Sequence, residues 1–232
     1  DKYGIVDIIG DKEAFKKVFS EYREMGSMVP KEMWAKYGNK QNKIMLQEAF
    51  SFYPSDWLKY VQDNNCKICA PKSNRGYFCY GTPNGRIDII KGKYDFSSNY
   101  ITISMNGVRK TTPYHEIGHM VEFFNKDALR LSLEYRRKRT QGTQLESLGK
   151  LLNVEDYKGE LTYADNFINP YIGKDYGNHG SELLSMGLES VFSPNEKGHA
   201  KRFNYKTNAY EFASIIDDME YLHFIIGMIL KA

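Results

Sequence analysis

The stretch His115-Glu116-Ile117-Gly118-His119 decides how this chain is interpreted. Histidines at positions i and i+4 lie on one face of a helix, where both imidazoles can bind the same tetrahedral metal ion. Glu116 lies beside that face and can reach a metal-bound water. Zinc lowers the pKa of such a water to about 7, so a carboxylate can accept its proton at neutral pH. The pattern predicts His115 and His119 as zinc ligands and Glu116 as the catalytic base.

The flanking residues favour a partly buried helix over two surface histidines on an ordinary helix. Thr112-Pro113 is a typical helix start, with Thr112 as N-cap and Pro113 at the first helical position. Apolar Met120 and Val121 follow the second histidine. The alternating run 101–104 predicts a half-buried strand just upstream.

A catalytic zinc needs a third protein ligand and one open position. Position 122 is Glu122 and position 125 is Asn125, which excludes the metzincin spacing HExxHxxGxxH. We therefore expect an acidic ligand from a second helix. Glu182 is the preferred candidate, because it opens a helix just behind Ser181. Glu189 lies two turns later on the same helix face and is the alternative, which the sequence leaves open.

Zinc peptidases stabilise the transition state with a donor opposite the general base, often Tyr or His. Tyr163, Tyr171 and Tyr176 lie in the loop before Glu182, and His179 lies three positions before it. Tyr176 is the first choice for this catalytic role, followed by Tyr171 and His179.

Four segments resemble a zinc-peptidase domain found in the C-terminal part of phage and prophage minor head (head-morphogenesis) proteins and in related toxin-like polypeptides. They are residues 112–123, 169–176, 181–189 and 220–227, within a resemblance that covers roughly 77–230. The 182–185 spacing is also similar to the second motif of thermolysin-like gluzincins. The resemblance implies a gluzincin-type site, with His115 and His119 as ligands, Glu116 as base and Glu182 as the acidic ligand. The family pattern has Phe where this chain has His223.

The motifs and the resemblance together predict a single α+β, zincin-like domain over 1–232, with a helical N-terminal part (1–76) and a catalytic core (77–232). We expect a small antiparallel sheet packed on the HExxH helix, with 101–104 as the edge strand that a substrate pairs with. The other predicted elements are helices at 11–25, 42–52, 126–140, 181–192 and 210–230, strands at 77–80 and 86–90, a turn at 82–85, and loops at 63–76 and 153–180.

Composition narrows the class of protein. Of the 232 residues, 41% are hydrophobic and 26% charged, which is typical of a globular chain. A net charge of +3, from 32 basic and 29 acidic residues, does not favour nucleic-acid binding, and we expect the basic run 136–139 to be a solvated helix end. We expect no membrane segment, because no apolar run is long enough. Cys66, Cys69 and Cys79 suggest reduced thiols, with a weak metal knuckle or redox pair as the alternative.

These observations predict a zinc metalloendopeptidase that hydrolyses a protein or peptide substrate, as part of a larger phage-encoded polypeptide and in the cytoplasm or the virion. Three alternatives stay open. One is a phage structural or interaction module with an inactive zinc site, and another is a toxin-type protease. The third is a ferritin-like di-iron oxidase, in which Glu116–His119 and Glu220–His223 act with Glu182 and Glu48.

Overall fold

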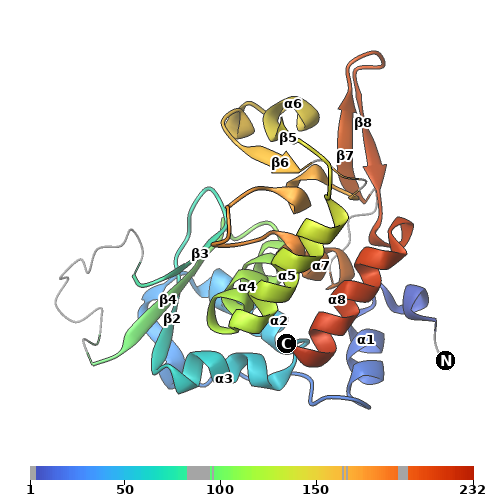
Figure 1. Cartoon of the computed structure of the whole chain (residues 1–232). Coiled ribbons are helices and arrows are strands. Elements are labelled where there is room, and N and C mark those ends of the chain that lie inside the picture. Colours follow the sequence, from blue (N-terminus) through green and yellow to red (C-terminus); the bar gives the residue numbers. More distant parts are fainter. Residues whose placement is uncertain (1–3, 83–94, 96, 164, 166, 193–197) are drawn as a thin grey trace.

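The computed structural model describes the chain except for residues 1–3, 83–94, 96, 164, 166 and 193–197. The predicted strand 86–90 and most of the predicted turn 82–85 lie outside the described residues. The architecture is mixed α/β: helices surround one four-stranded sheet, and two small hairpin-like sheets extend the later part of the chain (Figure 1).

The main sheet is mixed rather than antiparallel, so that part of our prediction is wrong. Its order is β1-β2-β4-β3, with β1 parallel to β2 and β2 parallel to β4, while β3 runs antiparallel to β4. Helices α2 (Lys40–Phe50) and α3 (Ser55–Asp63) form the crossover that a parallel β1–β2 pair requires. The strand bounds are β1 Trp34–Gly38, β2 Cys66–Ala70, β3 Tyr77–Tyr80 and β4 Asn99–Ser104.

Two strand predictions are corrected by this topology. The stretch 63–76 is not a loop throughout, because the apolar residues around Ile68 form the buried strand β2. The run 101–104 is not an edge strand, because β4 is hydrogen-bonded on both sides, to β2 and to β3. Among the described strands, β3 is the edge of the sheet next to β4.

The HExxH helix is α4 (Thr112–Phe124), and it begins at the residue predicted as its N-cap. Thr112 is the first helical residue rather than the N-cap, and Thr111 precedes it without a side-chain capping hydrogen bond. It packs most extensively on α7 (Leu183–Phe192), and α5 (Lys126–Arg139) follows it after a single residue, Asn125. The Asn125 side chain caps α5 by accepting from the backbone N–H groups of Asp127 and Ala128.

The N-terminal helices join the same hydrophobic cluster as α4 and α7. Helix α1 (Lys12–Phe19) is shorter than predicted, and Asp11 caps it by accepting from Ala14 N. Phe15 packs edge-on against Phe192 of α7, with ring centroids 4.7 Å apart. Helices α2 (Lys40–Phe50) and α3 (Ser55–Asp63) complete this side.

The region after α5 differs most from expectation. The predicted helix 210–230 is wrong in its first half, because Ala209–Ala213 forms strand β8, paired antiparallel with β7 (His199–Asn204). Aromatic residues favour strands, and Asp218 caps α8 (Met219–Lys231) only later. This hairpin projects from the body (Figure 1). The remaining elements are α6 (Leu148–Leu152), β5 (Leu145–Ser147), β6 (Leu161–Tyr163) and the 3-10 helices Ile5–Ile8, Lys31–Met33, Glu155–Tyr157, Pro170–Gly173 and Ile215–Asp217.

Within the described part of the chain, each helix is too short or too polar to cross a membrane.

Candidate metal centre

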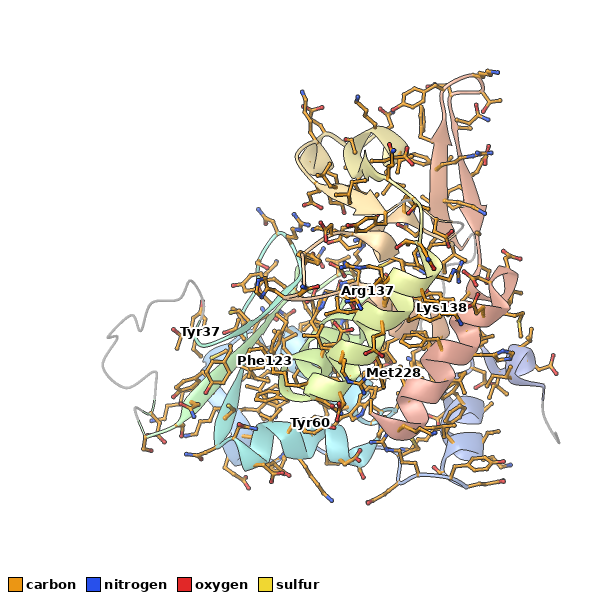
Figure 2. The ribbon with its side chains drawn as sticks, in the orientation of Figure 1. Tyr37, Tyr60, Phe123, Arg137, Lys138 and Met228 are labelled. Atoms are coloured by element: carbon orange, nitrogen blue, oxygen red, sulfur yellow. The ribbon has the colours of Figure 1, made fainter. Side chains whose placement is uncertain are left out.

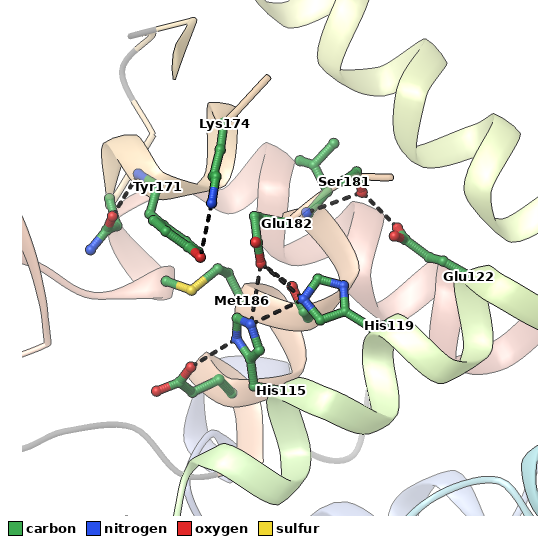
Figure 3. A network of polar contacts seen from close by, with 12 residues as sticks. His115, His119, Glu122, Tyr171, Lys174, Ser181, Glu182 and Met186 are labelled. Carbon is green, nitrogen blue, oxygen red and sulfur yellow. Dashed lines mark hydrogen bonds and ion pairs between the residues drawn. The ribbon is translucent and has the colours of Figure 1, made fainter. Parts of the chain in front are cut away.

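The two histidines of α4 converge on one carboxylate. His115 Nε2 lies 3.2 Å from His119 Nε2, and Glu182 Oε2 lies 3.2 Å from each of these nitrogens. The three candidate ligand atoms lie within 4.8 Å of one another (Figure 3). A buried group of two imidazoles and one carboxylate can hold a metal ion.

A glycine sets the distance between the two helices that carry this group. A Cβ on Gly118 would lie 2.6 Å from Ser185 Cα and 2.9 Å from Ser185 N, well inside van der Waals contact. Helices α4 and α7 therefore cross without a side chain between them at this point. This close crossing brings Glu182, immediately before α7, against the histidine face of α4.

Glu182 is 1% exposed, and both of its carboxylate oxygens accept hydrogen bonds. Its Oε2 accepts from Ser185 Oγ at 2.9 Å, and its Oε1 accepts from Tyr176 OH at 2.5 Å. Burial alone would raise the pKa of Glu182, but His119 and His115 outweigh burial and hold this pKa well below its ordinary value. The same contacts, with Glu189, raise the pKa of His115 despite its burial. A metal ion binding here would displace protons from the imidazoles.

Glu189 occupies the opposite side of His115 from the ligand group. Its Oε2 accepts from His115 Nδ1 at 3.1 Å, which directs His115 Nε2 towards Glu182. Carboxylates in this position fix the ring orientation and tautomer of a ligating histidine. Of the two acids that the sequence leaves open, Glu182 therefore carries a candidate ligand atom, and Glu189 lies behind the candidate ligand His115.

Glu116 faces the same cavity from α4. It is 4% exposed, and its Oε2 is buried with no hydrogen-bond partner among the described residues. Its Oε1 lies against the backbone of Gly76, where an added Cβ would be only 2.6 Å away. Burial is the main reason that the pKa of Glu116 is raised. An unpartnered buried carboxyl beside a metal-binding group is well suited to accept a proton.

A cavity of about 490 Å³ opens onto these residues. Its walls come from residues 75–78 at the start of β3, from α4, and from the loop before α7. Tyr171, Tyr176 and His179, the three candidate donors, all line it, whereas Tyr163 lies elsewhere, with its ring over Arg136. Tyr176 is closest to the ligand group, through its bond to Glu182, and His179 is exposed at the cavity wall.

A buried pair of side chains, Ser181 and Glu122, supports the start of α7 and was not predicted from the sequence. Ser181 Oγ donates to Glu122 Oε1 at 2.7 Å and accepts from Leu183 N at 3.3 Å. Glu122 is 3% exposed, and burial raises its pKa to about 7. Only its position on α4, about one turn after His119, hints at this role in the sequence.

The other predicted or alternative residues lie apart from this group. Glu220 and His223 are exposed on α8, and Glu48 pairs with Lys12 at 2.5 Å, so the described residues do not assemble the ligand set of a di-iron centre. His199 is buried at the start of β7, with Nε2 2.8 Å from Ser190 Oγ.

The cysteines also lie outside the group. Cys66, Cys69 and Cys79 are free thiols on β2 and β3, and burial raises the pKa of Cys69 to about 12. A thiol with so high a pKa is a poor nucleophile and a poor metal ligand at neutral pH. Among the described residues, the thiols belong to no candidate metal group.

Comparison of the chain with protein-family models, with curated proteins and with solved structures found no match.

Proposed function

We propose that this chain is a zinc-dependent metallopeptidase with a gluzincin-type site in a zincin-like fold. The observation that carries the proposal is the approach of Glu182 Oε2 to both His115 Nε2 and His119 Nε2, at 3.2 Å each. Beside them lies Glu116 Oε2, which has no hydrogen-bond partner among the described residues. The resemblance of the four segments to phage-associated zinc-peptidase domains supports the same conclusion.

The donor set favours zinc. Two histidines and one glutamate are the three protein ligands of a catalytic zinc, which keeps a fourth position open for water or substrate. Calcium and magnesium prefer oxygen ligands, so two imidazoles disfavour them. When bound, the ion would polarise the substrate carbonyl and lower the pKa of its water.

Glu116 acts as the general base and then as the general acid. Its Oε2 accepts a proton from the attacking water and delivers it to the leaving amine nitrogen of the peptide. The raised pKa of this buried carboxyl brings its proton affinity closer to the working range of a general base at neutral pH.

Tyr176 stabilises the charge that develops on the carbonyl oxygen. Burial and the neighbouring Glu182 carboxylate raise the pKa of this phenol, so it remains a hydrogen-bond donor. Its OH lies 2.5 Å from Oε1 of Glu182, the residue whose Oε2 is a candidate ligand atom, so a small rotation can direct it to a substrate oxygen at the ion.

The edge of the sheet supports an extended peptide as substrate. Among the described residues, strand β3 pairs with β4 on one side and with no strand on the other, and residues 77 and 78 line the cavity that holds Glu116. A free strand edge binds extended peptides through main-chain hydrogen bonds. We assign to β3 the substrate-pairing role that the sequence assigned to 101–104.

The test compares Glu116→Gln with wild type on fluorescently labelled casein, in zinc-loaded protein. We expect at least a 100-fold loss of hydrolysis with zinc content unchanged, because Glu116 moves a proton but does not bind the ion. Glu220→Gln, an exposed acid on α8, is the matched control and should retain full activity. Hydrolysis by Glu116→Gln at near the wild-type rate would contradict the general-base role, and an inactive wild type holding zinc would favour an interaction module.

A further inference from the structure

The basic run at the end of α5 is not wholly a solvated helix end. Arg137 and Lys138 are exposed and lie on the outside of α5 (Figure 2). Arg136 points inward and is 7% exposed, although it lies in the same helical turn. The burial of a permanently charged guanidinium requires a specific set of acceptors.

Those acceptors are the backbone carbonyls on either side of Tyr176. Arg136 Nη1 donates to Lys174 O at 2.8 Å, and Arg136 Nη2 donates to Gly177 O at 2.9 Å. The same nitrogen lies 3.6 Å from Asp175 Oδ1, which accepts from Gly177 N at 2.9 Å. The planar fork of one guanidinium thus holds both ends of the segment 174–177.

Backbone hydrogen bonds also hold this segment, because Asp175 N donates to Leu161 O at 2.9 Å and His179 N donates to Tyr176 O at 3.3 Å. Tyr176 is 38% exposed, and Gly177 adopts a left-handed φ of 63°. Lys174 is tied down, because its Nζ lies 2.7 Å from Glu160 Oε2 and 4.6 Å from the centre of the Tyr176 ring. The carbonyl of this same Lys174 is one of the two that Arg136 holds.

We propose that Arg136 is a positioning residue that holds the backbone around Tyr176 so that the phenol stays next to Glu182. The catalytic consequence rests on the proposed peptidase function, whereas the structural role does not. Lysine cannot replace this arginine fully, since an ammonium lacks the planar fork that reaches two carbonyls at once.

Arg139 is the matched control. It lies at the same end of α5 and is largely buried, but it bonds to Asp218 of α8 through both terminal nitrogens at 2.9 Å, and to Asp165. Arg139→Gln therefore removes a comparable charge without touching the segment 174–177. Arg137→Gln controls for a change on the exposed face.

The first experiment measures amide hydrogen exchange in the metal-free protein. We expect peptides covering 174–180 to exchange at least tenfold faster in Arg136→Gln than in wild type, and at the wild-type rate in Arg139→Gln and Arg137→Gln. Arg136→Lys should be intermediate, and it serves as the test variant if Arg136→Gln does not fold. Unchanged exchange in 174–180, or equal acceleration in Arg139→Gln, would overturn the proposal.

The second experiment is a double-mutant cycle on labelled casein, with zinc content measured for each variant. We expect Arg136→Gln to lower kcat about 10- to 100-fold with KM and zinc content unchanged, and to have no further effect in a Tyr176→Phe background. Equal losses in both backgrounds would contradict action through Tyr176. If wild type itself is inactive, the peptidase proposal fails, and the exchange experiment still decides the role of Arg136.

Discussion

Replacing Gly118 with alanine tests whether the close crossing of α4 and α7 builds the ligand group. The added Cβ would lie 2.6 Å from Ser185 Cα, while ordinary carbon contacts begin near 3.4 Å. Backbone atoms of Ser185 are among the nearest neighbours of this Cβ and cannot rotate away, so the helices must separate by about 1 Å. Metal–ligand distances tolerate only about 0.2 Å, so this movement should take Glu182 out of register with the histidines.

The free-energy cost follows from two opposed effects. Overpacking a well-filled helix interface destabilises the fold by about 1–3 kcal/mol, whereas the higher helix propensity of alanine stabilises it by about 1 kcal/mol relative to glycine. We expect a net loss of about 1 kcal/mol, or a Tm lower by about 3 °C for a chain of this size. Zinc affinity should fall at least tenfold, because the disturbance lies between the ligands.

Gly227→Ala is the control for this prediction. Gly227 also lies inside a helix, α8, but an added Cβ there meets no atom within 4 Å. This variant should be slightly more stable than wild type and bind zinc equally well. Calorimetry and competitive zinc titration measure both quantities. A Gly118→Ala protein with unchanged Tm and zinc affinity would refute the claim that Gly118 sets the distance between α4 and α7.

The remaining predictions concern three carboxyl groups. In a chelator competition, Glu182→Ala should weaken zinc binding sharply and Glu189→Ala only modestly. Glu182 carries a candidate ligand atom, whereas Glu189 only orients His115. The reverse order of the two effects would exchange the roles of these acids. The pKa of Glu122 is about 7 in the folded chain, above its ordinary value of 4.5. Between these two pH values the folded state keeps Glu122 protonated while the unfolded state does not, so the stability of the fold falls as the pH rises. Glu122→Gln should therefore gain about 3 kcal/mol relative to wild type between pH 4 and pH 8 in urea unfolding, and a difference independent of pH would contradict this.

Local chemistry explains what could be predicted. The start of α4 at Thr112 follows from Pro113 in its first turn, and the extent of α5, from Lys126 to Arg139, follows from helical periodicity. The i, i+4 spacing of His115 and His119 places both imidazoles on one face without any tertiary information.

Tertiary packing explains what could not be predicted. Strand β2 contains Cys66 and Cys69 in a segment bounded by turn residues, and only its pairing with β1 and β4 makes it a strand. The choice between Glu182 and Glu189 depends on where α7 crosses α4, and the crossing depends on Gly118. The inward direction of Arg136 within a basic run depends on carbonyls about 40 positions away in the chain.

The central claim is that His115, His119 and Glu182 together hold one zinc ion. Anomalous diffraction at the zinc absorption edge, from crystals of zinc-reconstituted protein, tests it most directly. We predict one peak per chain, about 2 Å from Nε2 of each histidine and from a Glu182 carboxylate oxygen. The absence of a peak there, a peak at the cysteines of β2, or two metal ions in the cavity would contradict the claim.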